Sequence, residues 1–212
     1  MKPKILIIYS TTDGHTPSIC DRLMHVMAQQ DCQVQVLPLA QATSADLAGC
    51  DCIVVGASIR YGKHQPAVAQ FIESHLNILT QKNGAFFTVN IVARKPEKNR
   101  PDTNPYMLKF LRQITWRPRL LGVFAGKLDY PRYGFIDRLM IRLIMLITHG
   151  PTDPKAVIEF TDWAQVEDFG RQVCALAGQP TSAPGGAMAV PRRCCQTSCC
   201  SSSCEGPRSG LL

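Results

Sequence analysis

The sequence lacks both glycine-rich motifs that bind nucleotides in many α/β proteins. No Gly-x-x-x-x-Gly-Lys pattern is present, so a nucleoside triphosphate with bound magnesium is a poor fit. Gly14 stands alone after the first apolar run, where a dinucleotide fingerprint needs three spaced glycines. These absences argue against two large nucleotide classes but not against a ligand with a terminal phosphomonoester.

The ten cysteines lack the spacing of a disulfide framework or a zinc module. Five are scattered from Cys20 to Cys174, and the other five lie beyond residue 190 with no flanking histidine, so we predict no metal site. The segment 179–212 is rich in Ser, Gly, Pro and Cys and has no aromatic residue, which predicts a disordered tail. A translated frameshift or an unrelated extension would look the same. No secretory signal is recognisable, so we expect a reducing, cytosolic setting.

Acidic residues are scarce between Arg94 and Arg142. This segment has twelve Lys and Arg residues and four Asp and Glu residues. Its formal net charge of +8 therefore exceeds the +7 of the whole chain. Such a local field attracts anionic partners. We do not expect nucleic acid among them, because these cations lie around an apolar insertion and match no binding motif.

A continuous apolar run from Ile5 to Ile8 is typical of a strand buried on both faces of a parallel sheet. It leads into a loop rich in hydroxyls and backbone donors: Ser10, Thr11, Thr12, Asp13, Gly14, His15 and Thr16. We expect Thr16 to be the N-cap of a helix that starts at Pro17, so that unpaired N–H groups and the helix dipole converge on a phosphate. The alternative is an ordinary strand-to-helix turn with a Ser/Thr cap.

Strands alternate with helices along residues 1–178. The pattern predicts strands at 4–9, 33–37, 51–57, 85–90 and 120–127, and helices at 16–30, 65–79, 105–115 and 162–176. This order predicts an α/β domain with a five-stranded parallel sheet, helices on both faces and a long insertion after the fifth strand.

Three loops should meet at the carboxyl ends of the strands, where ligands of such sheets bind. They follow Tyr9, Ala57 and Asn90. A hydroxyl-rich first loop, an aromatic Tyr61 in the second and a donor-rich third suit a flat, phosphorylated ring system. FMN is therefore the candidate cofactor.

The insertion spans about residues 128–155. From Phe135 to Thr148, apolar residues recur at helical spacing between flanking arginines. This helix is too short to cross a bilayer, where about 20 residues are needed, but it could lie in the interface with its arginines at anionic head groups. Packing on its own domain or on a second subunit is the alternative, and a homo-oligomer stays open.

Five segments carry a family resemblance: STTDGHT at 10–16, GASIRYG at 56–62, NIVARKPEK at 90–98, WRP at 116–118 and YPRY at 130–133. The first is shared by flavodoxins generally, whereas VARKPEK and YPRY are much more specific. Over about residues 1–178 the chain resembles the flavodoxin-like, menaquinone-dependent protoporphyrinogen oxidases of bacterial haem biosynthesis. The resemblance implies an FMN enzyme, peripheral on the cytoplasmic face of the inner membrane. It would oxidise protoporphyrinogen IX to protoporphyrin IX in three two-electron steps and pass the electrons to menaquinone or ubiquinone.

The resemblance also implies roles for individual residues. Residues 10–16 would hold the flavin phosphate, Ser58, Ile59, Arg60, Tyr61 and Gly62 would border the ring, and Asn90, Ile91, Val92, Ala93 and Arg94 would line its other side. No catalytic side chain is predicted, because the flavin itself carries the redox chemistry. Many flavodoxins place an aromatic residue in the third loop, and its absence here would leave one flavin face open to a large planar substrate.

Five cations are candidate partners for the two propionates of protoporphyrinogen: Arg94, Lys95, Lys98, Arg100 and Arg132. The alternative for each is a solvated surface charge. Two other functions stay open at this stage, a flavodoxin-type electron carrier and an NAD(P)H-quinone reductase. A carrier usually has an acidic docking surface, and no nicotinamide site is recognisable in the sequence.

Overall fold

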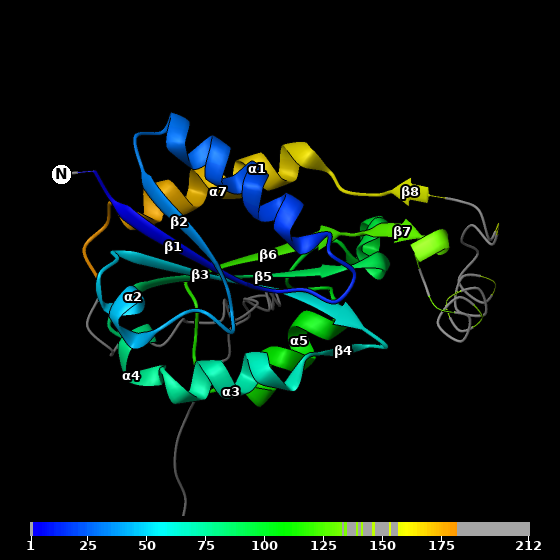
Figure 1. Cartoon of the computed structure of the whole chain (residues 1–212), viewed down its shortest axis with the longest axis horizontal. Coiled ribbons are helices and arrows are strands. Elements are labelled where there is room, and N and C mark those ends of the chain that lie inside the picture. The colour runs from blue at the N-terminus through cyan, green and yellow to red at the C-terminus, as the bar shows by residue number, and fades with distance from the viewer. Residues whose placement is uncertain are drawn as a thin grey trace, which may run out of the picture.

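The protein forms an α/β domain around one parallel sheet, as the computed structural model describes it for residues 2–132, 134, 139, 141, 146, 153 and 157–181. Five parallel strands follow the order β2-β1-β3-β5-β6 (Figure 1). They are β1 (Lys4–Ser10), β2 (Gln33–Pro38), β3 (Cys52–Arg60), β5 (Asn83–Asn90) and β6 (Leu120–Ala125). The predicted five-stranded parallel sheet is confirmed. Chain order reverses at β1, which puts the topological switch point between β1 and β3.

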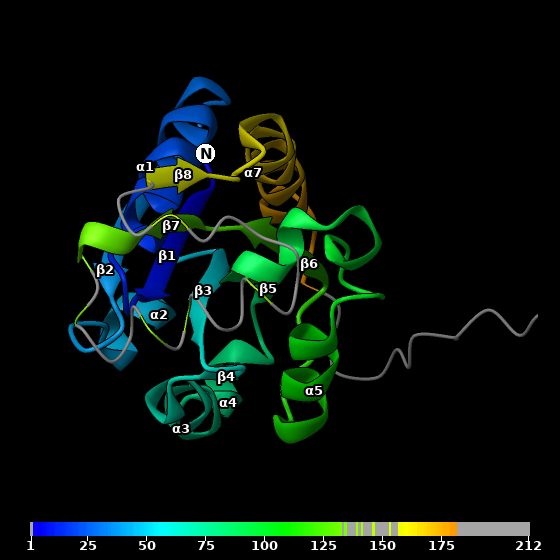
Figure 2. The same cartoon turned by 90° about the vertical axis from the view of Figure 1, so that its right-hand side faces the viewer.

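Helices cover both faces of the sheet (Figures 1 and 2). On one face lie α1 (Thr16–Gln29) and α7 (Trp163–Ala177), and on the other α3 (Pro66–Ser74), α4 (Leu76–Leu79) and α5 (Pro105–Gln113), with the short α2 (Ser44–Ala48) beside β2. Ile5 and Ile7 of β1 pack with α1 and α7, whereas Leu6 and Ile8 pack with the helices of the opposite face. All four side chains are at most 1% exposed, so β1 is buried on both faces as predicted.

The sheet and the helices approach closely at two glycines. A Cβ on Gly56 would lie 2.1 Å from the ring of Phe87, and one on Gly84 would lie 2.5 Å from Cζ2 of Trp116. Real Cβ atoms do not come that near, so the aromatic rings fill the space that these glycines leave.

Several element bounds differ from the prediction. The helix predicted at 65–79 is two helices, because the backbone of His75 leaves the helical region (φ −112°, ψ 16°) and its ring nitrogen Nδ1 lies 2.9 Å from the carbonyl oxygen of Phe71. The helix α2 was not predicted. Its N-terminus has a capping box, in which Thr43 and Asp46 bind each other's backbone N–H groups.

After β6 the chain forms a two-stranded antiparallel ribbon of β7 (Lys127–Asp129) and β8 (Val157–Glu159), which was also not predicted. Most of the predicted helix from Phe135 to Thr148 lies outside the described residues. Residues 182–212 of the predicted tail also lie outside them. Among the helices that the structure describes, none is long and apolar enough to cross a membrane.

Candidate functional site

The three predicted loops meet at the carboxyl ends of β1, β3 and β5, near the ribbon at the right-hand end of the sheet in Figure 1. They line one pocket together. Its walls come from the first loop (Thr11, Asp13, His15, Thr16), from the end of β3 (Ser58, Ile59) and from the end of β5 (Val89, Asn90, Ile91), with Gly126 and Lys127 beyond them. The structure therefore brings together residues from all three segments that the sequence singled out.

The first loop ends at the N-terminus of α1, but not with the predicted cap. The helix begins at Thr16, its N-cap is His15, and no side chain caps it. Thr16 as N-cap is therefore wrong, because the backbone of His15 is already close to helical and moves Thr16 into the first turn. The hydroxyl of Thr16 is buried and has no hydrogen-bond partner. A hydroxyl left in this state beside free helix N–H groups can bind an anion.

Gln65, which sequence reasoning did not single out, holds the first loop in place. Its Oε1 accepts a hydrogen bond of 2.7 Å from the Ser10 hydroxyl, and its Nε2 donates to the carbonyl oxygen of Thr11 and the hydroxyl of Thr12, both at 3.1 Å. Ser58 adds a contact, since its Oγ accepts from the backbone N–H of Thr12 at 3.1 Å. Gln65 is the N-cap of α3 and lies more than 50 residues after the loop residues that it binds. A local sequence pattern therefore cannot predict these hydrogen bonds.

The second segment is a strand and hairpin, not the predicted loop. Ser58 to Arg60 continue β3, and Ile59 and Arg60 pair with the two residues of β4 (Lys63–His64). Tyr61 (φ 50°) and Gly62 (φ 74°) form the turn, and positive φ at both central residues is what a tight hairpin requires.

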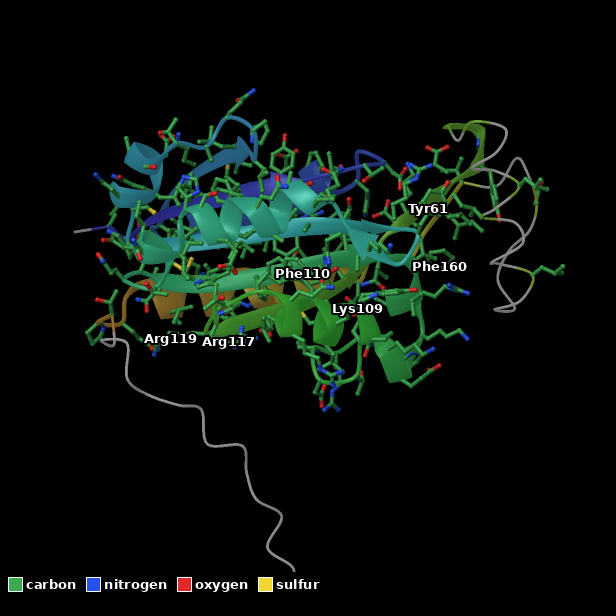
Figure 3. All side chains as sticks on the ribbon, turned by 90° about the horizontal axis from the view of Figure 1, so that it is seen from below. Tyr61, Lys109, Phe110, Arg117, Arg119 and Phe160 are labelled. Atoms are coloured by element: carbon green, nitrogen blue, oxygen red, sulfur yellow. The ribbon has the colours of Figure 1, made fainter. Side chains whose placement is uncertain are left out.

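This hairpin carries its side chains toward the first loop. Arg60 forms an ion pair of 2.5 Å with Asp13 and lies 5.3 Å from the centre of the Tyr61 ring. Tyr61, at the tip of the hairpin, is 51% exposed. Figure 3 shows Tyr61 at the end of the hairpin, above Lys109.

Asn90 organises the third segment. Its Oδ1 accepts from the backbone N–H of Ala93 at 2.9 Å and from Nδ2 of Asn104 at 3.4 Å, which shapes the 3₁₀ turn of Ile91–Arg94. These two donors fix which end of the amide is oxygen. The buried Nδ2 of Asn90 has no partner, so it is a second polar group at the pocket with unused hydrogen-bonding capacity.

His15 connects the first loop to the segment after β8. The Thr161 hydroxyl donates to the carbonyl oxygen of Ala125 at 2.9 Å, so its oxygen accepts from Nε2–H of His15 at 2.7 Å. Burial lowers the pKa of His15, which favours the neutral ring. The hydrogen bond from Nε2 of His15 to Thr161 therefore connects two loops, which agrees with the prediction that His15 is a loop residue and not a catalytic base.

The predicted substrate cations differ in their surroundings. Arg94 is half-buried and donates to the carbonyl oxygen of Ile91 at 3.2 Å, and Arg100 forms an exposed two-bond pair with Asp102. Lys95 and Lys98 are half-buried on the same loop. The side chain of Arg132 lies outside the described residues.

Two polar atoms that line this small pocket, about 30 Å³ in volume, suit the groups of a phosphorylated flavin. Buried polar groups in proteins are almost always hydrogen-bonded, and each exception calls for an explanation. Within the described residues, the only buried side-chain atoms without a partner are Oγ1 of Thr16 and Nδ2 of Asn90, and both residues line this pocket. One stands at the N-terminus of α1, where a phosphate would bind, and the other at the end of β5, where the polar edge of a ring system would lie.

Comparisons with known proteins agree with this geometry. Residues 6–155 match the family model described as Flavodoxin domain. The chain is 44% identical over 175 residues to the protoporphyrinogen IX dehydrogenase (quinone) of Leishmania major, a match covering 82% of this chain and 76% of that protein. It is 42% identical over 178 residues to the protein of that name from Escherichia coli strain K12, covering 84% of this chain and 98% of that protein. Among solved structures, a flavodoxin from the domain Archaea superposes with a TM-score of 0.50 at 17% identity, over 83% of this chain and 99% of that one, which shows the fold alone.

Proposed function

The chain belongs to the flavodoxin domain family and to the family of the quinone-dependent protoporphyrinogen IX dehydrogenases, and we propose that it catalyses the reaction that gives those enzymes their name. The substrate is protoporphyrinogen IX, the product is protoporphyrin IX, and a quinone, menaquinone or ubiquinone, takes the electrons. The reaction belongs to porphyrin and haem biosynthesis. The cofactor is FMN.

The observation that carries the proposal is the pair of unpaired buried atoms at Thr16 and Asn90. A phosphomonoester at the N-terminus of α1 gives the Thr16 hydroxyl an acceptor, and the free N–H groups of the first turn complete its binding. The Nδ2 group of Asn90 donates to a carbonyl or nitrogen at the edge of the flavin ring. FMN provides both groups in one molecule of the right kind, a flat ring with one terminal phosphate.

Bound FMN would supply the two-electron redox chemistry between the substrate and the quinone. The chain's own residues bind and orient. Gln65 and Ser58 hold the phosphate loop, and the Arg60–Asp13 ion pair fixes the hairpin against it. Tyr61 would border one side of the flavin ring, and Asn90 and Ile91 would leave its other side without an aromatic cover, which suits a large planar substrate.

Cations of the third segment bind the propionates of the substrate in this proposal. Arg94, Lys95 and Lys98 lie on the loop after β5, which begins at the pocket-lining residue Ile91. Arg100 contributes less, because Asp102 already neutralises its charge at 2.7 Å.

The protein associates peripherally with the cytoplasmic face of a bacterial inner membrane, through the segment from Phe135 to Thr148. Two of its leucines support this part of the proposal. Leu139 and Leu146 are helical, lie seven residues apart, and are 61% and 68% exposed. Residues at this spacing share one side of a helix. Replacing both with Gln should reduce cosedimentation with anionic liposomes, and undiminished binding would contradict the membrane role.

A steady-state assay tests the reaction itself. Purified holoenzyme is mixed with protoporphyrinogen IX and a soluble menaquinone analogue under anaerobic conditions, and the fluorescence of protoporphyrin IX is followed. Quinone-dependent turnover is the expected result. Turnover with NADPH and quinone but not with porphyrinogen would favour an NAD(P)H-quinone reductase. A flavin that exchanges electrons only with protein partners would favour an electron carrier.

A further inference from the structure

A second pocket lies beneath the β3–β4 hairpin, between α3 and α5, and has a volume of about 330 Å³. That is in the size range of small-molecule sites, about 300–1,000 Å³. Its walls come from Gly62, Lys63 and His64 of the hairpin and from Tyr106, Lys109 and Phe110 of α5. Figure 3 shows Lys109 and Phe110 on α5 below the hairpin that bears Tyr61.

Aromatic rings form the inner wall of this pocket. The His64 ring lies 4.3 Å from that of Phe110 and 5.8 Å from that of Phe86, measured between centroids. Burial lowers the pKa of His64 to about 4, so at neutral pH the ring is uncharged and packs as an aromatic. Its Nε2 is already engaged with the Thr88 hydroxyl at 3.1 Å.

Two cations stand at the mouth of the pocket, on opposite walls. Lys63 comes from β4 and Lys109 from α5, and both are exposed. In the described part of the chain neither side chain has an ion pair with an acidic residue. A pocket with an aromatic wall and two unneutralised ammonium groups at its rim suits an anion attached to a flat apolar body.

The pocket also adjoins the proposed flavin site. Gly62 lines it, and the preceding residue, Tyr61, is the exposed aromatic at the hairpin tip. A tetrapyrrole that lies on the uncovered flavin face and reaches past the edge of the ring near Tyr61 can therefore place one carboxylate arm over the edge of the hairpin. Of the candidate cations whose side chains the structure describes, namely Arg94, Lys95, Lys98 and Arg100, none lines this pocket.

We propose that the pocket between the hairpin and α5 binds one propionate arm of the tetrapyrrole substrate, with Lys63 and Lys109 as carboxylate partners and the His64–Phe110 wall against the ring edge. The inference rests on the proposed function and extends it, since it assigns the two propionates to different sets of cations. One goes to the loop after β5 and the other to this pocket.

The test compares the double variant Lys63→Gln, Lys109→Gln with Lys4→Gln, which removes an exposed lysine at the far end of β1. In the holoenzyme the double variant should raise the KM for protoporphyrinogen IX about tenfold, with kcat and FMN content unchanged. Lys4→Gln should leave all three unchanged. With the dimethyl ester of the substrate, which has no carboxylates, the double variant should have nearly the wild-type KM. Equal effects on acid and ester, or no effect on the acid, would overturn the assignment.

Equilibrium binding separates this inference from the proposed function. Fluorescence anisotropy of protoporphyrin IX and of its dimethyl ester measures affinity for the holoenzyme without turnover. If the wild type binds the free acid more tightly than the ester and the double variant loses that difference, the pocket assignment stands even where no oxidation is detected. If the wild type oxidises porphyrinogen but the double variant keeps its preference for the acid, the pocket assignment fails and the proposed function stands.

Discussion

Replacing Thr16 with Val should have opposite effects on the empty protein and on its complex with FMN. Val keeps the shape and the β-branch of Thr and removes only the hydroxyl. That hydroxyl is buried and unpaired in the absence of a ligand. An unsatisfied buried polar group costs about 1–3 kcal/mol, so its removal should stabilise the apoprotein by about 1 kcal/mol. For a domain of this size the expected rise in Tm is about 2–4 °C.

Binding of FMN should weaken at the same time. A hydrogen bond to a charged group contributes about 1.5–3 kcal/mol, and the variant loses one such bond to the phosphate. The Kd for FMN should therefore rise by about 10- to 150-fold. At FMN concentrations well above the wild-type Kd, the variant should lose the stability advantage that it has as apoprotein, because stabilisation by a ligand grows with the logarithm of the ligand concentration divided by Kd.

Two measurements check this prediction. Titration of apoprotein with FMN, followed by flavin fluorescence, gives the Kd, and calorimetry of the apoprotein gives Tm. Thr80→Val is a matched control, because the Thr80 hydroxyl is exposed and bonds only to backbone carbonyls of its own helix. It should leave the Kd unchanged. An unaltered Kd in Thr16→Val would refute the phosphate assignment, and a joint loss of apoprotein stability and affinity would show that Thr16 serves the fold instead.

Three further predictions follow from single side chains. Asn90→Asp keeps the oxygen that shapes its loop but replaces the unpaired Nδ2 donor with an anionic oxygen, so FMN titrations should give a Kd at least about tenfold higher with unchanged circular dichroism. Gly84→Ala places a Cβ 2.5 Å from Trp116 and should cost about 1–3 kcal/mol in urea unfolding, whereas Gly178→Ala, with no neighbour nearer than 3.8 Å, should be almost neutral; similar losses in both would contradict the packing argument. His64 has a folded-state pKa of about 4, below its ordinary 6.5, so the unfolded chain takes up the proton first as pH falls. Stability should drop by about 1–2 kcal/mol from pH 7 to pH 5, and His64→Leu should flatten this slope in urea titrations at the two pH values.

The sheet could be predicted from the sequence because its central strands are short, continuous apolar runs. The side chains of Ile5 to Ile8 pack against helices on both faces of the sheet. All four residues must therefore be apolar, and such a run can be recognised in the sequence. The β3–β4 hairpin gave a weaker signal. Tyr61 adopts a positive φ at a turn position where Gly, Asn or Asp is usual, so its sequence resembled that of an ordinary loop.

The site was predictable as a set of loops but not as a set of contacts. Residues 10–16 and the end of β5 were identified from their composition and from the family resemblance. Gln65 was missed, because its three hydrogen bonds reach a loop that is remote in sequence. The unpaired state of Thr16 depends on whether the helix begins at Thr16 or one residue later, and helix ends are the least certain part of a sequence-based prediction.

The most direct test of the whole account is a single-turnover reduction of the bound flavin without oxygen or quinone. Protoporphyrinogen IX should bleach the visible absorption band of the flavin, with one protoporphyrin IX formed for every three flavins reduced, because the oxidation removes three electron pairs. NADPH at the same concentration should leave the band unchanged. Bleaching by NADPH with no response to protoporphyrinogen IX would contradict the account.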